Sequence, residues 1–120
     1  MKTWAVVGLG NNPERAAFGV AKLLQDKGHR IIPVYPRAEI VHGEVGYKTL
    51  TEIPGPVDVV DCFVNSTLVG KVVDEAIAIG AKAVWLQLDV IDNHAIARAQ
   101  AAGLVTVMDR CPAIEYRKKS

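Results

Sequence analysis

A glycine turn near the amino terminus is the feature of this sequence that most constrains its fold. The apolar run Trp4–Val7 ends in Gly8 and Gly10, and residues 16–24 then have the apolar spacing of a helix. A strand, a glycine turn and a helix in this order bring backbone N–H groups toward an anion, usually a phosphate. Gly8 permits a sharp turn, and Gly10 permits a ligand to approach the backbone. The turn therefore predicts a phosphate site over residues 8–15.

The residues around this turn do not favour NAD as the ligand. The dinucleotide fingerprint has a third glycine, and Pro13 stands in its place. It also has an acidic residue about 20 positions further on that holds the adenosine ribose, where this sequence has Tyr35 and Arg37. Pro13 fits the first turn of a helix that begins near residue 13 or 14 and is capped by Asn12. A nucleotide with an additional phosphate on its ribose stays compatible with Arg37.

Composition predicts a soluble intracellular domain. The 120 residues suit one domain, residues 1–120, and half of them are apolar. No apolar run approaches the roughly 18 residues that a membrane span needs, and no signal segment is recognisable at the start. The formal charge of +1 is too balanced for a nucleic-acid binder. We therefore expect a cytoplasmic protein that binds neither nucleic acid nor membrane, with Cys62 and Cys111 as reduced thiols.

Strand and helix patterns alternate along the chain. Apolar runs predict strands at 4–8, 30–34, 57–64, 83–88 and 104–108, and helical spacing predicts helices at 14–27, 66–79 and 92–102. A short strand is an option at 44–47, and one helical turn is expected at 49–53. Pro33 cannot donate to a ladder, so we place it where the second strand leaves the sheet. The alternation predicts an α/β domain with a doubly wound, parallel, five-stranded, Rossmann-like sheet in the order 3-2-1-4-5.

The carboxyl ends of these strands are the expected ligand site, because doubly wound sheets bind ligands where the strand order reverses. This rule selects residues 8–15, 35–37, 63–67, 87–90 and 109–111. Arg15 opposes the helix dipole unless an anion lies beside it, and a solvated arginine is the alternative. Tyr35 and Arg37 suit stacking on an adenosine and pairing with a phosphate, and an ordinary strand exit is the alternative.

Other polar residues near these ends have simpler interpretations. Ser66 and Thr67 fit the cap of the following helix, Trp85 fits the core, and Cys111 fits a small buried site. The histidines are scattered and form no triad, metal site or acid–base pair: His29, His42 and His94. The residues alone therefore indicate a binding domain without a catalytic centre.

Four motifs, in the same order along the chain, resemble a known family. They are Val7–Arg15, Ile32–Pro36, Val84–Gln87 and Met108–Pro112. Together they closely resemble the small stand-alone CoA-binding proteins, which are similar to the amino-terminal CoA-binding domain of the succinyl-CoA synthetase α subunit. The resemblance covers essentially the whole chain and implies a Rossmann-like domain that binds coenzyme A or an acyl-CoA.

The resemblance also implies where the parts of coenzyme A lie. The pyrophosphate is expected at residues 8–15, the adenosine near 34–37, and the pantetheine arm along 63–67 toward the fourth and fifth strands. The implied site residues are Gly8, Leu9, Gly10, Asn12, Arg15, Val34, Tyr35, Pro36, Arg37, Phe63, Asn65, Gln87 and Cys111. The chain departs from the family pattern at Gly10, where Ser or Thr is common, at Asn65–Ser66, where a basic pair is usual, and at Asp89, where glycine is common. We expect these departures to weaken affinity rather than alter the fold.

The leading hypothesis is therefore non-enzymatic binding of coenzyme A or an acyl-CoA, as a carrier or sensor. The synthetases' phosphorylated histidine and nucleotide-binding parts lie in domains that 120 residues cannot contain, so ligase activity is not expected of this chain alone. The alternative is an NAD(P)-binding oxidoreductase or redox-sensing domain with Arg37 on a 2′-phosphate. A third hypothesis is a partner-binding module that has lost its ligand. The expected strand order separates Cys62 from Cys111, which predicts two free thiols, with Cys111 placed to form a mixed disulfide with the ligand.

Overall fold

The computed structural model describes residues 2–112 and 114. Its elements are β1 (Thr3–Val7), α1 (Ala16–Asp26), β2 (Arg30–Val34), the 3-10 turn η1 (Leu50–Glu52), β3 (Val59–Cys62), α2 (Ser66–Ala78), β4 (Ala83–Leu86), α3 (Asn93–Ala101) and β5 (Val105–Val107). Each predicted helix and main strand is present with slightly different ends. The optional strand at 44–47 is not formed, and two isolated bridges, Val34 with Tyr47 and Val41 with Glu44, occur there instead.

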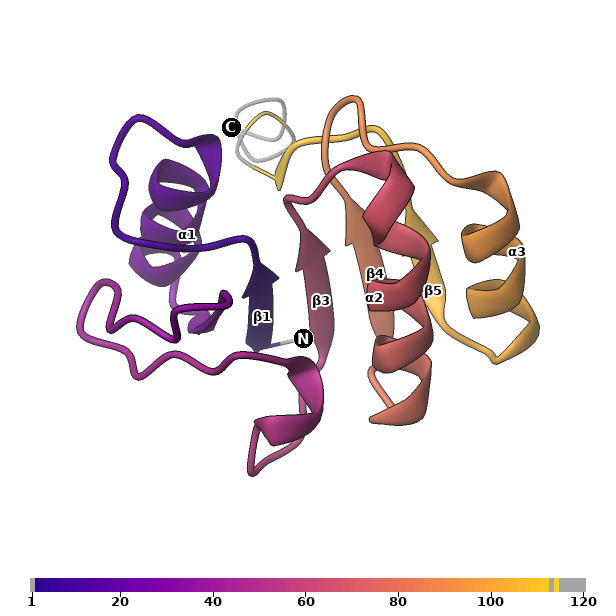
Figure 1. Cartoon of the computed structure of the whole chain (residues 1–120), viewed down its shortest axis with the longest axis horizontal. Coiled ribbons are helices and arrows are strands. Elements are labelled where there is room, and N and C mark those ends of the chain that lie inside the picture. Colours follow the sequence, from indigo (N-terminus) through magenta and orange to yellow (C-terminus); the bar gives the residue numbers. More distant parts are fainter. Residues whose placement is uncertain (1, 113, 115–120) are drawn as a thin grey trace.

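The strands form one parallel sheet in the order β2-β1-β3-β4-β5. Figure 1 shows β1, β3, β4 and β5 in this order from left to right. The predicted fold class is confirmed, but the predicted order 3-2-1-4-5 is wrong, because β3 lies between β1 and β4 rather than outside β2. The carboxylate of Asp58, just before β3, accepts hydrogen bonds from the backbone N–H groups of Lys2 and Thr3, both at 2.9 Å. These bonds from Thr3 and Lys2 hold the pKa of Asp58 below its ordinary value. They also join the start of β3 to the start of β1.

Pro33 gives a physical reason for the position of β2 at the sheet edge. It stands inside β2, opposite Val6 of β1, rather than where the strand leaves the sheet. On the side away from β1, its carbonyl accepts a hydrogen bond from the N–H of Tyr47, at 2.9 Å. Because proline has no backbone N–H, it cannot complete a ladder with a second neighbouring strand, and it is confined to edges and bulges. The predicted order would have put β2 inside the sheet.

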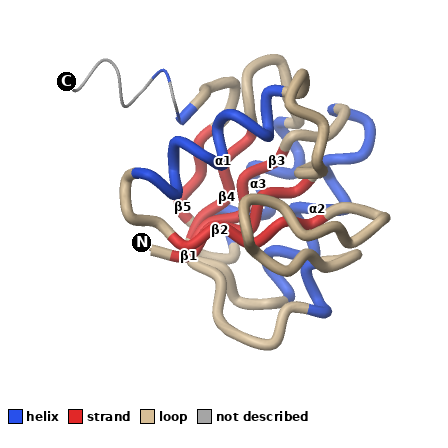
Figure 2. The backbone as a smooth tube through the Cα atoms, turned by 90° about the vertical axis from the view of Figure 1, so that its left-hand side faces the viewer, coloured by secondary structure: helices blue, strands red, loops and turns tan. Residues whose placement is uncertain are grey.

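Helices cover both faces of the sheet (Figures 1 and 2). Along β1, Trp4 and Val6 face the core beneath α1, whereas Ala5 and Val7 face the core beneath α2 and α3. Residues of α1 complete the first core, and residues of η1, α2 and α3 complete the second. The strands are apolar on both faces for this reason, as expected of a parallel sheet between two helical layers.

The amino terminus of α1 lies later in the sequence than predicted. The helix begins at Ala16, and its N-cap residue, Arg15, supplies no capping side chain. The Asn12 side chain accepts a hydrogen bond from the N–H of Glu14, at 3.0 Å, and so caps a separate turn within the loop. The prediction that Asn12 caps the helix is therefore wrong, because the loop after β1 makes one more turn before α1 starts. No side chain hydrogen bond then caps the start of α1.

The amino terminus of α2 is capped one residue earlier than predicted. Asn65 is the N-cap, and its side chain accepts a hydrogen bond from the N–H of Thr67, at 2.9 Å. The Ser66 hydroxyl instead donates to the carbonyl of Asp89, at 3.2 Å, and accepts from the N–H of Ile91, at 2.9 Å. Ser66 therefore connects the start of α2 to the loop after β4, rather than acting as a helix cap.

Candidate functional site

The strand order reverses between β1 and β3. From β1 the chain passes through α1 to β2 on one side, and it then crosses back to form β3 on the other side. Ligands of doubly wound sheets bind beyond the carboxyl ends of the strands at such a point. Three cavities, of about 450, 410 and 430 Å³, adjoin this point, and Arg15 lines all of them. The observed order thus brings the residues after β3 directly beside the glycine turn.

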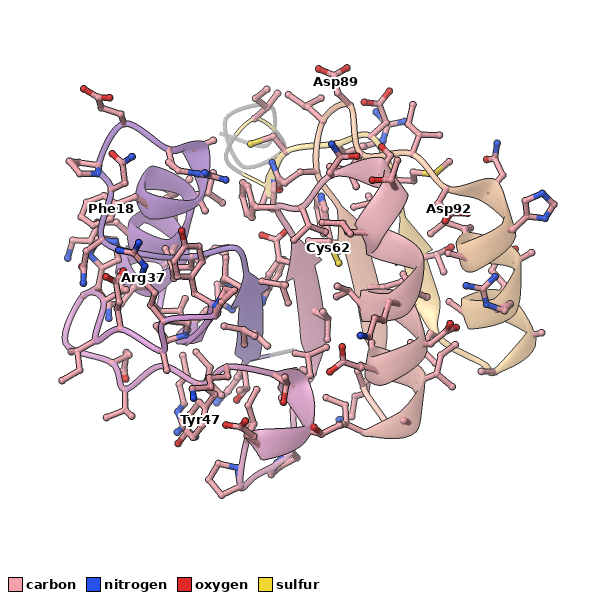
Figure 3. The ribbon with its side chains drawn as sticks, in the orientation of Figure 1. Phe18, Arg37, Tyr47, Cys62, Asp89 and Asp92 are labelled. Atoms are coloured by element: carbon pink, nitrogen blue, oxygen red, sulfur yellow. The ribbon has the colours of Figure 1, made fainter. Side chains whose placement is uncertain are left out.

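The first cavity, here the glycine-loop cavity, lies between the turn after β1 and the segment after β2. It is lined by Gly8, Gly10, Asn11, Asn12, Pro13, Arg15, Tyr35, Arg37 and Glu39. Gly8 has a φ of +100°, and a Cβ at this position would overlap the backbone carbonyl of Phe63. Only glycine therefore lets the turn pass so close to the end of β3. Arg37 lies to the left of β1 in Figure 3.

Glu39 places a carboxylate at the glycine turn. Its Oε1 accepts a hydrogen bond from the backbone N–H of Asn11, at 2.9 Å. A Cβ on Gly10 would lie 2.9 Å from the same oxygen and 3.4 Å from the ring of Tyr35. The Asn11 side chain donates to the carbonyl of Ile40, at 2.7 Å, which keeps the two segments together. The N–H of Asn11 thus already holds an anionic oxygen, the kind of group that a phosphate would bring.

The second cavity, here the α2-side cavity, combines apolar and aromatic side chains with cations. Its apolar and aromatic lining residues are Val7, Val34, Tyr35, Pro36, Leu50, Phe63, Val64, Leu68 and Val72. Its lining also contains Arg15, Lys48 and Lys71 together with Thr49, Asn65 and Glu75. Apolar side chains around a few polar groups are typical of a site for an organic ligand. The three cations further favour a ligand with negative charge.

The third cavity, here the α1-side cavity, lies over the carboxyl ends of β3 and β4. It is lined by Arg15, Ala16, Ala17, Phe63, Val64, Asn65, Gln87, Leu88, Val90 and Cys111. Gln87 is only 5% exposed, and its Oε1 has no hydrogen-bond partner among the described residues. Cys111 is half-buried, and both cysteines are free thiols. The cavity is thus largely apolar, with one buried amide and one thiol in its wall.

All but one of the predicted site residues line these cavities. They are Gly8, Gly10, Asn12, Arg15, Val34, Tyr35, Pro36, Arg37, Phe63, Asn65, Gln87 and Cys111. Leu9 is the exception, because its side chain is fully buried in the core beneath α1. Sequence reasoning missed several of the lining residues, among them the charged residues Glu39 and Lys71. Neither residue has a local motif, since Glu39 stands in an irregular segment and Lys71 lies within a helix.

Asp89, in the loop after β4, and Trp85, in β4 itself, both bond to the segment after β5. Asp89, where the similar family commonly has glycine, has a φ of +66° and lies at the tip of this loop (Figure 3). Its N–H donates to the Asp109 carboxylate, at 2.7 Å, which links the ends of the loops after β4 and β5. The prediction that Trp85 belongs to the core is confirmed only in part, because its side chain is half-buried and packs against the core, with its ring 5.6 Å from that of Trp4. The Trp85 indole N–H donates to the carbonyl of Arg110, at 2.8 Å.

Asp61 is a buried acid in the middle of β3. It is fully buried, it pairs in register with Val6 and Trp85, and neither carboxylate oxygen has a hydrogen-bond partner within the part of the chain that the structure describes. Burial raises its pKa well above the ordinary value. Burial and the neighbouring Asp61 also raise the pKa of the Cys62 thiol.

The described part of the chain contains no cluster of three or more His, Cys, Asp or Glu side chains that could hold a metal ion. Of the histidines, His42 forms a hydrogen bond between its imidazole and the backbone carbonyl of Phe18, at 2.8 Å. No helix within residues 2–112 is long and apolar enough to cross a membrane.

The parallel sheet, its two helical layers and the cavities at the switch point define a Rossmann-like α/β domain. Residues 2–117 match the family described as the CoA binding domain, and the chain belongs to this family. The resemblance seen in the sequence motifs is thereby confirmed.

Relatives of the chain include whole small proteins and one part of a larger enzyme subunit. The uncharacterized protein YneT of Bacillus subtilis (strain 168) is 34% identical over 110 residues, which cover 92% of this chain and 82% of YneT. The α subunit of the ADP-forming acetate–CoA ligase II of Pyrococcus furiosus is 36% identical over 81 residues, 67% of this chain but only 18% of that subunit. A hypothetical protein from Pyrococcus horikoshii OT3 has a similar structure, with a TM-score of 0.93, 38% identity, and coverage of 98% of this chain and 82% of that one.

Proposed function

We propose that this protein binds coenzyme A or an acyl-CoA and does not itself catalyse a reaction. The observation that carries the proposal is the arrangement of the three cavities around Arg15 at the switch point. Together these cavities, which share Arg15, offer backbone N–H groups, cations and apolar walls. Coenzyme A has matching parts, namely phosphates, an adenine ring and a long, weakly polar pantetheine arm.

Each part of coenzyme A has residues that suit it. The N–H groups of the glycine loop and Arg15 suit the pyrophosphate, since a helix amino terminus without a capping side chain favours an anion. The apolar and aromatic side chains of the α2-side cavity suit the adenine, with Tyr35 and Phe63 as aromatic contacts. Arg37 suits the phosphate on the ribose, because a guanidinium forms strong charge-assisted hydrogen bonds to phosphate. The α1-side cavity then receives the pantetheine arm.

The family and the relatives support binding rather than a complete ligase activity. The chain belongs to the CoA binding domain family, and its match to the acetate–CoA ligase α subunit spans 18% of that subunit. The groups that line the cavities are those that hold and orient a ligand. A role as carrier or sensor of the free or acylated coenzyme follows from this proposal.

Glu39 is the observation that favours a second candidate, an NAD(P)-binding domain. A carboxylate near the glycine turn is the group with which dinucleotide-binding domains hold the hydroxyls of the adenosine ribose. Glu39 lies in the glycine-loop cavity, although its Oε1 is bonded to the backbone of Asn11. Coenzyme A and NAD(P) are therefore to be compared directly in the same assay.

Calorimetry and thermal unfolding test the proposal. Coenzyme A is expected to raise the melting temperature more than NAD or NADP at equal concentration, because a ligand that binds only the folded state stabilises it by mass action. The phosphate contact of Arg37 is expected to contribute about 1.5–3 kcal/mol, roughly a 10- to 150-fold preference for coenzyme A over dephospho-CoA. Arg37→Ala is expected to remove most of this preference and to change dephospho-CoA affinity little.

Arg30→Ala is the matched control, because Arg30 is an exposed arginine at the start of β2, whereas Arg37 follows the carboxyl end of that strand. It is expected to bind both ligands as the wild type does. A larger thermal shift with NAD or NADP than with coenzyme A would contradict the proposed function. A full preference for coenzyme A in Arg37→Ala would show that another cation holds the ribose phosphate.

A further inference from the structure

The wall of the α1-side cavity contains a thiol. Of the two cysteines, Cys111 lines this cavity, whereas Cys62 is fully buried in β3 on the face covered by α2 and α3. Both are free in the structure. Because burial and the adjacent Asp61 raise the pKa of Cys62, that thiol is suppressed as a nucleophile. Cys111 is half-buried, and a ligand within the cavity can reach it.

Gln87 indicates what kind of ligand the cavity accepts. Its side chain is 95% buried in the wall that also contains Cys111, and its Oε1 lacks a hydrogen-bond partner among the described residues. Buried amide oxygens in folded proteins are nearly always hydrogen-bonded, so this acceptor suits an N–H group brought by a ligand. The remaining wall near it is apolar and includes Phe63, Leu88 and Val90. A narrow chain that carries an amide N–H and ends in sulfur matches this wall.

We propose that Cys111 is a site of reversible thiolation by the disulfide form of an amide-bearing thiol, and the pantetheine end of coenzyme A fits this description. The proposal rests on the proposed function for the entry of the ligand from the glycine loop. It adds a covalent step that binding alone does not require. The protein would then retain the coenzyme under oxidising conditions and release it under reducing ones.

The step is a thiol–disulfide exchange and needs no external oxidant. The Cys111 thiol first loses its proton to water, and the thiolate attacks the pantetheine sulfur of a coenzyme A disulfide. A new sulfur–sulfur bond forms between Cys111 and the pantetheine, and the original disulfide bond breaks. The electron pair of that bond leaves with the second thiolate, which takes up a proton from water. One disulfide is consumed and one is formed, so the exchange causes no net oxidation.

Intact-mass spectrometry of the full chain tests the site with three probes. These are coenzyme A disulfide, pantetheine disulfide, which lacks the nucleotide, and hydroxyethyl disulfide, which lacks the amide and the nucleotide. Coenzyme A disulfide is expected to add one coenzyme A moiety, which dithiothreitol removes. It should react about tenfold or more faster than hydroxyethyl disulfide at equal concentration, because binding raises the local concentration of the reacting sulfur. Equal rates for the two would overturn the proposal, since they would indicate an ordinary accessible thiol.

Variants locate the reacting atom and the role of the amide. Cys111→Ser is expected to abolish the adduct, and the matched control Cys62→Ser to keep it. Gln87→Leu is expected to slow the reaction of the two pantetheine-containing probes several-fold and to leave that of hydroxyethyl disulfide unchanged. An adduct on Cys62, or a Gln87→Leu protein that reacts with all probes as the wild type does, would overturn the proposal. Circular dichroism of each variant verifies that it is folded.

Calorimetry of Cys111→Ser with reduced coenzyme A separates this inference from the proposed function. Binding to this variant, combined with no adduct on the wild-type protein, would overturn the thiolation site and leave the proposed function intact. The opposite result, reaction with pantetheine disulfide at Cys111 without any coenzyme A binding, would support the thiolation site and contradict the proposed function.

Discussion

Replacing Asp61 by asparagine is expected to remove a destabilisation of the folded protein that grows with pH. Asp61 is fully buried between Val6 and Trp85 in the sheet, and neither of its carboxylate oxygens has a hydrogen-bond partner among residues 2–112. A charged carboxylate in such a position is strongly disfavoured, so the folded protein keeps Asp61 protonated to a higher pH than the unfolded chain does. Asparagine has nearly the same shape and does not titrate.

The sign of the effect follows from proton binding. Burial raises the folded-state pKa of Asp61 well above the ordinary value of 3.8, which is the value expected in the unfolded chain. Between these two pKa values the folded state holds the additional proton, so stability falls as pH rises. One proton corresponds to at most about 1.4 kcal/mol per pH unit, a tenfold change in the folded-to-unfolded ratio. The loss stops once the pH exceeds the folded-state pKa.

The neighbouring acid Asp58 acts in the opposite direction and in a different pH range. Backbone hydrogen bonds from Thr3 and Lys2 lower its folded-state pKa below 3.8. Its stabilisation is therefore present above the unfolded-state pKa and is lost only as the pH falls through the lowered value. Measurements above about pH 5 thus isolate the contribution of Asp61.

Urea unfolding followed by tryptophan fluorescence measures this effect, since Trp4 and Trp85 pack together in the core. The stability of Asp61→Asn minus that of the wild type is expected to increase from about pH 5 to about pH 8. Asp26→Asn is the matched control, because Asp26 is exposed and pairs with Lys22, at 3.2 Å on the same helix. The stability of Asp26→Asn should change with pH in parallel with that of the wild type. A constant difference between Asp61→Asn and wild type across this range would refute the reasoning.

Two further predictions concern the glycine turn. Gly8→Ala is expected to destabilise the protein by more than the roughly 1–2 kcal/mol of a left-handed backbone, because the new Cβ also meets the carbonyl of Phe63. Gly28→Ala, with a φ of +93° and nothing within 4 Å of a new Cβ, is the control in urea unfolding, and equal losses for the two variants would contradict the steric argument. Glu39→Gln removes a negative charge from the glycine-loop cavity and is expected to tighten coenzyme A binding by about tenfold in calorimetry. Glu44→Gln, in the same segment, should not change affinity, and an unaltered affinity in Glu39→Gln would show that its carboxylate does not oppose the phosphates.

The local parts of this fold were predictable because their signals lie within a few residues. Glycines at 28, 80 and 103 mark the ends of the three helices, and each has the positive φ expected after a helix. The apolar runs define the strands, and the turn after β1 places Gly8 and Gly10 where the expected phosphate loop lies. The family resemblance of the motifs likewise depends on short segments in the right order.

Strand order had no comparable local signal. Parallel strands between two helical layers are all apolar and resemble one another, so the sequence does not state which strands are neighbours. Pro33 was the exception, because its missing N–H favours an edge strand, but we interpreted it as the end of β2. The position of β3 next to β1 depends on contacts such as those of Asp58 with Lys2 and Thr3, more than 50 residues apart in the chain.

The sequence by itself determined the elements and the fold class, and all but one of the site residues predicted from it border the three cavities. Only the tertiary structure decided that Leu9 points into the core, that Glu39 reaches the glycine turn, and that Asp61 is buried with no hydrogen-bond partner among the described residues. The reason is physical: periodicity and turn chemistry act over a few residues, whereas burial and pairing depend on which distant segments the packed sheet and helices bring together.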